Sequence, residues 1–154
     1  MDHLAPPKEQ TNLLPVHLSP EAAATIQQHA ETEYPNECCG FLYGVEESVR
    51  FVNVAKPVFN RALENRQRRF VISPQDYLNA EQYATLNDLT LLGVYHSHPD
   101  HPAVPSIHDF EQAVPFFSYI ICPVNSKEAN VLRSWQLNRD GRFEEEKISI
   151  QSNV

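Results

Sequence analysis

The chain has 154 residues with a formal net charge of −8, and 42% of the residues are hydrophobic. This length suits one globular domain, and the acidic balance argues against a nucleic-acid binder because only the short run RQRR is basic. No apolar run approaches the ~18 residues of a membrane span, and MDHLAPPKEQ lacks the layout of a signal peptide, so we expect a cytoplasmic protein without a membrane contact.

The first segment, residues 1–13, is polar and contains prolines, so we expect a flexible leader followed by a single domain over residues 14–154. A short strand is expected at 14–18. Ser19 then has the position of an N-cap, with a proline directly after it, and predicts a helix over about residues 20–33.

Two strands are expected next, at 38–45 and 48–59, followed by a short strand at 70–72. The polar and basic segment 60–70 between them has few core anchors and predicts a loop. This loop is either a solvated connection or a segment that hydrogen-bonds an extended substrate. The candidate substrate-binding residues are Asn60, Arg61, Glu64 and Asn65.

The pattern of a capped helix returns at Ser73, with Asp76 three residues further on. The helix face expected to pack on the sheet consists of Tyr77, Ala80, Ala84 and Leu86. The remaining expected elements are a strand at 89–95, a short helix from Ser106 to about Val114, and strands at 118–124, 131–138 and 143–151. A hairpin turn is expected at 139–141 and a solvated acidic patch at 144–146. Together these elements predict an α/β fold with a mixed, largely antiparallel central sheet flanked by helices.

The run HSHPDHPAVPSIHD, residues 96–109, holds four of the seven histidines. Residues two apart share one face of a strand, so His96 and His98 point the same way, either as a solvated pair or as ligands of a divalent metal. Asp109, on the first turn of the helix after the loop, is placed to reach back to them. A His2Asp set with one open position is typical of a catalytic zinc site.

The same run also fits H-x-H-x-D-H, the zinc motif of the metallo-β-lactamase fold. That interpretation makes Asp100 and His101 ligands. However, the lactamase fold needs a longer chain and histidines far downstream, whereas no histidine follows His108.

The run matches HxHP, six residues and then SxxD, and PNECCGFLYG supplies Glu37 ahead of a Gly-containing strand. Over about residues 37–135 the chain therefore resembles the JAMM (MPN-plus) family of zinc metalloproteases, in particular its small stand-alone bacterial members. The resemblance implies a cytidine-deaminase-like fold. It also implies a Zn²⁺ cofactor, with His96, His98 and Asp109 as ligands, Glu37 as the proton acceptor and Ser106 as the group that stabilises the oxyanion.

The resemblance further implies a peptidase or isopeptidase that cleaves after the C-terminal Gly-Gly of a ubiquitin-like or sulfur-carrier protein. The partner is then the C-terminal tail of that protein. Trimming of a small carrier and removal of a modifier from a lysine remain open. The alternative is a non-catalytic MPN-type scaffold or zinc-binding module, although such members lack the ligands that this chain keeps.

Overall fold

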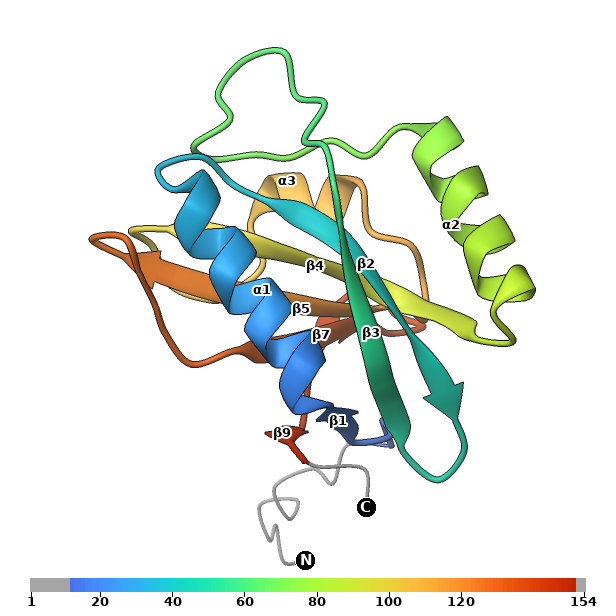
Figure 1. Cartoon of the computed structure of the whole chain (residues 1–154). Coiled ribbons are helices and arrows are strands. Elements are labelled where there is room, and N and C mark those ends of the chain that lie inside the picture. The colour runs from blue at the N-terminus through green and yellow to red at the C-terminus, as the bar shows by residue number, and fades with distance from the viewer. Residues whose placement is uncertain (1–11, 152–154) are drawn as a thin grey trace, which may run out of the picture.

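The structure is a computed structural model that describes residues 12–151 (Figure 1). Its helices are α1 (Pro20–Glu33), α2 (Pro74–Leu86) and α3 (Ile107–Glu111), and none of them is long and apolar enough to cross a membrane. Its strands are β1 (Val16–Leu18), β2 (Cys39–Glu46), β3 (Arg50–Val58), β4 (Thr90–Pro99), β5 (Ser118–Asn125), β6 (Glu128–Ala129), β7 (Arg133–Leu137), β8 (Phe143–Glu146) and β9 (Ile148–Ile150). The expected leader at 1–13 lies outside the described residues except for its last two positions.

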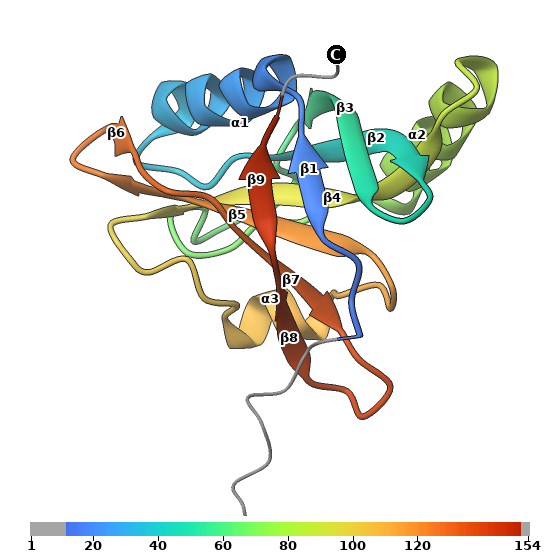
Figure 2. The same cartoon turned by 90° about the horizontal axis from the view of Figure 1, so that it is seen from below.

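The strands form one sheet with the order β8-β7-β5-β4-β2-β3-β1-β9, and β6 pairs with β5. β4 pairs with β5 in parallel, and β1 pairs in parallel with both β3 and β9, whereas the other pairs are antiparallel. β8 and β9 stand at opposite ends of this order, yet only Lys147 separates them along the chain (Figure 2). The sheet therefore curls, so that its two edges come close together. The expected mixed, largely antiparallel sheet with flanking helices is confirmed.

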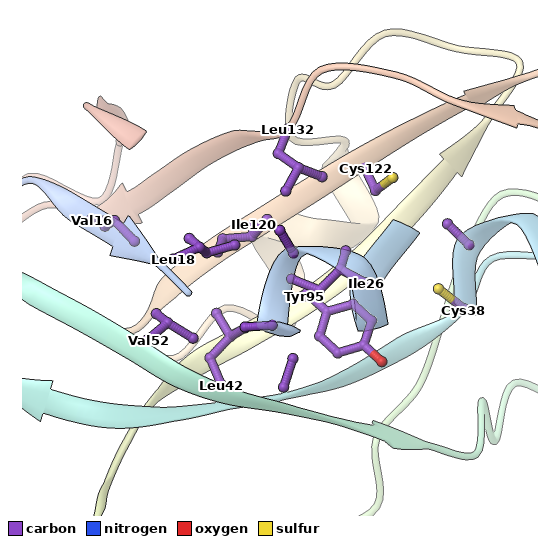
Figure 3. Close-up of a cluster of buried hydrophobic side chains, with 14 of the residues drawn as sticks. Val16, Leu18, Ile26, Cys38, Leu42, Val52, Tyr95, Ile120, Cys122 and Leu132 are labelled. Atoms are coloured by element: carbon purple, nitrogen blue, oxygen red, sulfur yellow. The ribbon is translucent and has the colours of Figure 1, made fainter. Parts of the chain in front are cut away.

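Helices cover both faces of the sheet (Figures 1 and 2). On one face, small and apolar residues of α1 pack into a core cluster that includes Tyr95 of β4 (Figure 3). On the other face, residues of α2 join a second cluster that includes Val94 of β4. Since side chains alternate along a strand, His96 follows Val94 onto the second face.

Each helix begins at the expected serine cap. The hydroxyl of Ser19 accepts from the N–H of Ala22, and Ser73 and Ser106 each form a capping box with the aspartate three residues on. α3 ends at Glu111 and not near Val114 as expected. The physical reason is Pro115, because the residue before a proline is disfavoured in a helix.

Leu86 does not pack on the sheet, because its side chain is 85% exposed. Ala80 and Ala84, four residues apart, are buried on one face of α2. Leu86 follows Ala84 by two residues, which is about 200° around a helix of 3.6 residues per turn. The prediction for Leu86 was therefore wrong.

Three expected strands also differ from the structure. Residues 70–72 form no strand. The carbonyl of Val71 accepts a hydrogen bond from the N–H of Arg61 at 2.9 Å instead. The expected strand at 131–138 is shortened to β7. The strand expected at 143–151 is divided into β8 and β9, because the chain leaves one edge of the sheet at Lys147 and joins the other.

The acidic patch expected at 144–146 is not solvated throughout. Glu146 is 2% exposed, and its carboxylate accepts hydrogen bonds from the side chains of Ser118, Ser134 and Gln136. Charge pattern alone placed this residue at the surface. The curled sheet places it inside, where three neutral donors compensate part of its lost hydration.

Candidate metal centre

The carboxyl end of β4 carries His96 and His98 into the protein. β4 lies between β2 and β5 in the sheet, and both histidines are 0% exposed. Their side chains point to the same face, as expected for residues two apart, and the Nε2 atoms lie 3.2 Å from each other. Ser97 between them points to the face that α1 covers.

Asp109 reaches the same point from the first turn of α3. Its Oδ2 atom lies 3.1 Å from the Nε2 atom of each histidine, and the residue is 4% exposed. Burial alone raises the pKa of this carboxyl group, but His96 and His98 hold the pKa of Asp109 well below its usual range. The structure thus brings the three expected ligands together.

These three residues fit a zinc ion. Nδ1 of His98 donates to the carbonyl of Pro102 at 2.6 Å, so the neutral ring turns the lone pair of Nε2 towards the cluster. Nδ1 of His96 and Oδ1 of Asp109 have no hydrogen-bond partner within residues 12–151. Tetrahedral zinc with bonds of roughly 2.0–2.1 Å has ligand atoms about 3.3–3.4 Å apart, which is close to the observed spacing.

Two aromatic rings line the cluster. Phe70 stacks on His96 with ring centroids 4.5 Å apart, and His101 stacks on His98 with centroids 4.0 Å apart. Phe70 is itself 2% exposed. Such a wall excludes water, and electrostatic interactions are stronger in the resulting low dielectric.

Glu37 precedes β2, the antiparallel neighbour of β4, and is 1% exposed. Neither carboxylate oxygen has a hydrogen-bond partner among the described residues, and Nε2 of His101 lies 4.0 Å from Oε2. Burial, with the nearby charge of Asp109, raises the pKa of Glu37 to about 9, although Arg68 opposes the shift. A buried carboxyl group with a perturbed pKa beside a candidate metal cluster is a candidate proton carrier.

Glu37, His98 and His101 form a second group whose possible ligand atoms lie within 4.8 Å of one another. Nδ1 of His101 donates to the carbonyl of Pro99 at 2.8 Å, so the lone pair of its neutral ring is on Nε2, the atom nearest to Glu37. His101 thus lies beside the expected proton acceptor. The sequence had suggested it only as a rival metal ligand.

Asp100, the other ligand of the lactamase-type interpretation, belongs to neither possible metal group within the described part of the chain. Its carboxylate accepts instead from the hydroxyl of Tyr34 and from the N–H of Ser126. Asp100 and His101 are therefore directed to different neighbours.

Ser106 lies directly beside the cluster as the N-cap of α3. Its Oγ atom accepts from the N–H of Asp109 at 3.1 Å, and its own N–H donates to Oδ2 of Asp109 at 2.8 Å. Since a hydroxyl group accepts and donates at the same time, capping leaves its hydrogen available to a substrate.

The four candidate residues of the loop at 60–70 have different surroundings. The amide of Asn60 makes four hydrogen bonds to the backbone of the chain itself. Arg61 pairs with Asp76 at 2.9 Å, whereas Glu64 and Asn65 are exposed. Arg61, Glu64 and Asn65 are thus exposed, whereas Asn60 is half-buried.

Two hollows adjoin the Glu37–His101 contact. One of about 270 Å³ is lined in part by Glu37, Asn60 and Arg66, and one of about 430 Å³ in part by His101 and Arg133. A further hollow of about 430 Å³ beside α1 and β9 contains none of the expected site residues. The residues that line this hollow therefore give no reason to prefer it as the active site.

Sequence reasoning did not single out Phe70 or the contact between His101 and Glu37. The contact of Phe70 with His96 and the contact of His101 with Glu37 each join residues that are far apart in the chain. The loop at 60–70 also has no periodic pattern that would predict its position. A single sequence carries no local signal for such a contact.

Comparison with known proteins agrees with this geometry. The family model of prokaryotic homologs of the JAB domain matches residues 19–138. A desampylase of Pyrococcus furiosus is 30% identical over 115 residues, which cover 75% of this chain and 76% of that protein. A desampylase of Haloferax volcanii is 34% identical over 110 residues, covering 68% and 78%. The solution structure of a protein from Desulfitobacterium hafniense has a TM-score of 0.78 and 30% identity, covering 90% of this chain and 94% of that one.

Proposed function

Because the chain belongs to the family of prokaryotic homologs of the JAB domain, as its resemblance to JAMM proteins predicted, we propose that it is a zinc-dependent peptidase or isopeptidase. The similarity to two desampylases supports a hydrolase of the isopeptidase type. The finer proposal is cleavage after the C-terminal Gly-Gly of a ubiquitin-like or sulfur-carrier protein.

The observation that carries this proposal is the convergence of His96, His98 and Asp109 beside Glu37. The three ligand candidates come from β4 and α3, and Glu37 precedes β2. Three ligands and a separate carboxyl group are the parts that a catalytic zinc site requires. A purely structural zinc site has four protein ligands and no need of a buried, unbonded glutamate.

Zn²⁺ held by His96, His98 and Asp109 supplies a Lewis acid that polarises a carbonyl group and makes water more acidic. Glu37, whose ionised form the charge of a bound Zn²⁺ would favour, takes a proton from the attacking water on its carboxylate and then passes the proton to the leaving nitrogen. Its low exposure of 1% keeps bulk water away from the proton during this transfer. The same carboxyl group thus acts first as base and then as acid.

Ser106 is proposed to donate its hydroxyl hydrogen to the oxygen of the scissile carbonyl as negative charge develops there. Its bonds with Asp109 hold it at the first turn of α3. A fixed donor of this kind costs little reorganisation during the reaction and is typically worth about 10²- to 10³-fold in kcat.

A Gly-Gly tail suits the depth of this site. The ligand candidates are only 0–4% exposed, so a substrate has to bring its backbone very close to the protein for its carbonyl to approach them. Glycine has no Cβ and allows the closest approach of a backbone. On the outside, we propose that the exposed side chains of Arg61, Glu64 and Asn65 contact the extended tail.

The test uses zinc-loaded protein with two substrates: a ubiquitin-like protein joined to a lysine through its Gly-Gly end, and a linear fusion with a short extension after Gly-Gly. We expect cleavage after Gly-Gly that a chelator stops and zinc restores. The substrate that is cleaved distinguishes an isopeptidase from a carrier-processing protease. Glu37→Gln should keep its zinc and lose about 10²- to 10⁴-fold in kcat.

Glu47→Gln is the matched control, since Glu47 is an exposed glutamate in the turn between β2 and β3. It should leave both zinc content and kcat unchanged. Zinc-loaded protein that cleaves neither substrate contradicts the proposal and favours the non-catalytic MPN-type scaffold or zinc-binding module.

A further inference from the structure

Four hydrogen bonds hold the backbone at Glu37 and Cys38. The N–H of Glu37 donates to the carbonyl of Arg66 at 2.7 Å, and its carbonyl accepts from Nδ2 of Asn60 at 3.1 Å. The N–H of Cys38 donates to Oγ of Ser97 at 2.8 Å, and its carbonyl accepts from the N–H of Ser97 at 3.1 Å. Every backbone polar group of these two residues is therefore bonded to another part of the chain.

The side chain of Glu37 is held in a different way. Neither of its carboxylate oxygens has a hydrogen-bond partner among residues 12–151, and the atom of His101 nearest to it is 4.0 Å away. A carboxylate that must bind and release a proton is best left without fixed donors, since these stabilise its charged form. The position of this carboxyl group is thus set mainly through its backbone.

Ser97 makes two of the four bonds from the carboxyl-terminal part of β4. Residue pairing between β2 and β4 ends at Cys39 opposite His96, and the hydroxyl of Ser97 continues the pairing by accepting from Cys38. Ser97 is 0% exposed and points away from the two histidines. Removal of its hydroxyl therefore leaves the ligand side chains with all their contacts.

Asn60 makes the corresponding bond from the loop. Nδ2 donates to the carbonyls of Glu37 and Arg69, both at 3.1 Å. Oδ1 accepts from the N–H groups of Ala62 at 3.0 Å and Val71 at 3.1 Å. Through these four bonds to the backbone, Asn60 joins the loop to the Glu37 backbone.

We propose that Ser97 and Asn60 are positioning residues for Glu37, which hold its backbone so that its free carboxyl group meets the substrate. This inference rests on the proposed role of Glu37 in hydrolysis. Displacement of a reacting group by about 1 Å costs on the order of 10²-fold in rate. The loss falls on kcat, because neither residue touches the substrate.

The first experiment compares zinc-loaded Ser97→Ala and Ser97→Thr with the unmodified chain. Ser97→Ala should lower kcat roughly 10- to 100-fold with unchanged KM and zinc content, and Ser97→Thr, which keeps the hydroxyl, should recover most of the loss. Ser134→Ala is the control, since it removes an equally buried hydroxyl that bonds Glu146. Equal kcat for Ser97→Ala and the unmodified chain, or a loss shared with Ser134→Ala, overturns the inference.

Asn60→Asp tests the loop side separately. Aspartate keeps both acceptor bonds of Oδ1, whereas its second oxygen cannot donate as Nδ2 does and repels the carbonyls of Glu37 and Arg69. We expect lower kcat with little change in KM. A raised KM with unchanged kcat instead supports the substrate contact and contradicts a positioning role.

Amide hydrogen exchange on the same zinc-loaded variants gives a readout that does not depend on turnover. Ser97→Ala should speed exchange at the Cys38 N–H. Asn60→Asp should speed exchange at the same N–H, which shares a peptide group with the Glu37 carbonyl that Asn60 bonds, and at the neighbouring Glu37 N–H, while the β5 amides stay protected. Unchanged exchange at both sites overturns the inference even if the protein cleaves neither substrate. Inactivity of the unmodified chain counts against the proposed function alone.

Discussion

Ser106 and Asp109 hydrogen-bond each other twice: the N–H of Asp109 donates to the hydroxyl oxygen of Ser106 at 3.1 Å, and the N–H of Ser106 donates to the carboxylate of Asp109 at 2.8 Å. The carboxylate oxygen in the second bond is also the one that lies 3.1 Å from His96 and His98. A five-residue helix such as α3 is too short to be stable in isolation. This reciprocal cap therefore both starts the helix and directs the third ligand.

Ser106→Ala should lower kcat about 10²- to 10³-fold, since it removes the proposed oxyanion donor. It also removes a helix cap, with a loss of about 0.5–2 kcal/mol in stability. Ser73→Ala removes the same kind of capping box from α2, away from the cluster. It should lose comparable stability in urea unfolding and keep its kcat, and an equal loss of kcat in both variants contradicts a direct role for Ser106.

Metal binding should follow the geometry of the cluster. His98→Ala and Asp109→Ala each remove a converging atom and should lose bound zinc, measured by elemental analysis after gel filtration. Asp100→Ala should keep zinc, because Asp100 bonds elsewhere, and His101→Ala should keep it too. Zinc loss in the last two variants with retention in the first two would support the lactamase-type ligands.

Glu146 should make stability depend on pH. Burial raises its pKa above the ordinary 4.5, although the hydrogen bonds from Ser134, Gln136 and Ser118 and the charge of Arg50 oppose the shift. The folded state therefore holds the proton more tightly than the unfolded state. The stability contributed by the protonated group is fully present below pH 4.5 and is lost as pH rises through the folded pKa.

Glu146→Gln removes this titration. Relative to the unmodified chain, the variant should gain stability in urea unfolding as pH rises above about 4.5, until Glu146 is fully ionised. Glu145→Gln is the control of opposite sign, since the hydrogen bond from Arg133 lowers the pKa of Glu145. At neutral pH, Glu145→Gln should be less stable than the unmodified chain. This difference in stability should become smaller as pH falls and Glu145 of the unmodified chain is protonated. A pH-independent difference for Glu146→Gln would contradict the assignment.

Gly93→Ala should destabilise the strand that carries the histidines. A Cβ atom at Gly93 would lie 1.9 Å from the carbonyl oxygen of Ser118, so β4 and β5 have to separate. Overpacking of this kind costs about 1–3 kcal/mol, and the melting temperature should fall accordingly. Gly141→Asn is the control, because nothing lies within 4 Å of that Cβ and asparagine tolerates its φ of +76°. Equal melting temperatures for Gly93→Ala and the unmodified chain would contradict this packing.

The sequence by itself determined the features that depend on neighbours a few residues away. The caps at Ser19, Ser73 and Ser106 follow from side chains that bond backbone groups within the next helical turn. The common direction of His96 and His98 follows from the alternation of a strand. The motif spacing also led to the family that the comparisons support.

Only the tertiary structure decided which distant groups meet and which charges are buried. Glu146 lies in an acidic run, yet the curled sheet encloses it, whereas Leu86 lies in an apolar pattern and is exposed. The meeting of Glu37 with His101 and the two bonds of Ser97 to Cys38 depend on how β2 and β4 pair. Local rules cannot supply these contacts, because burial and proximity result from the packing of segments that are remote along the chain.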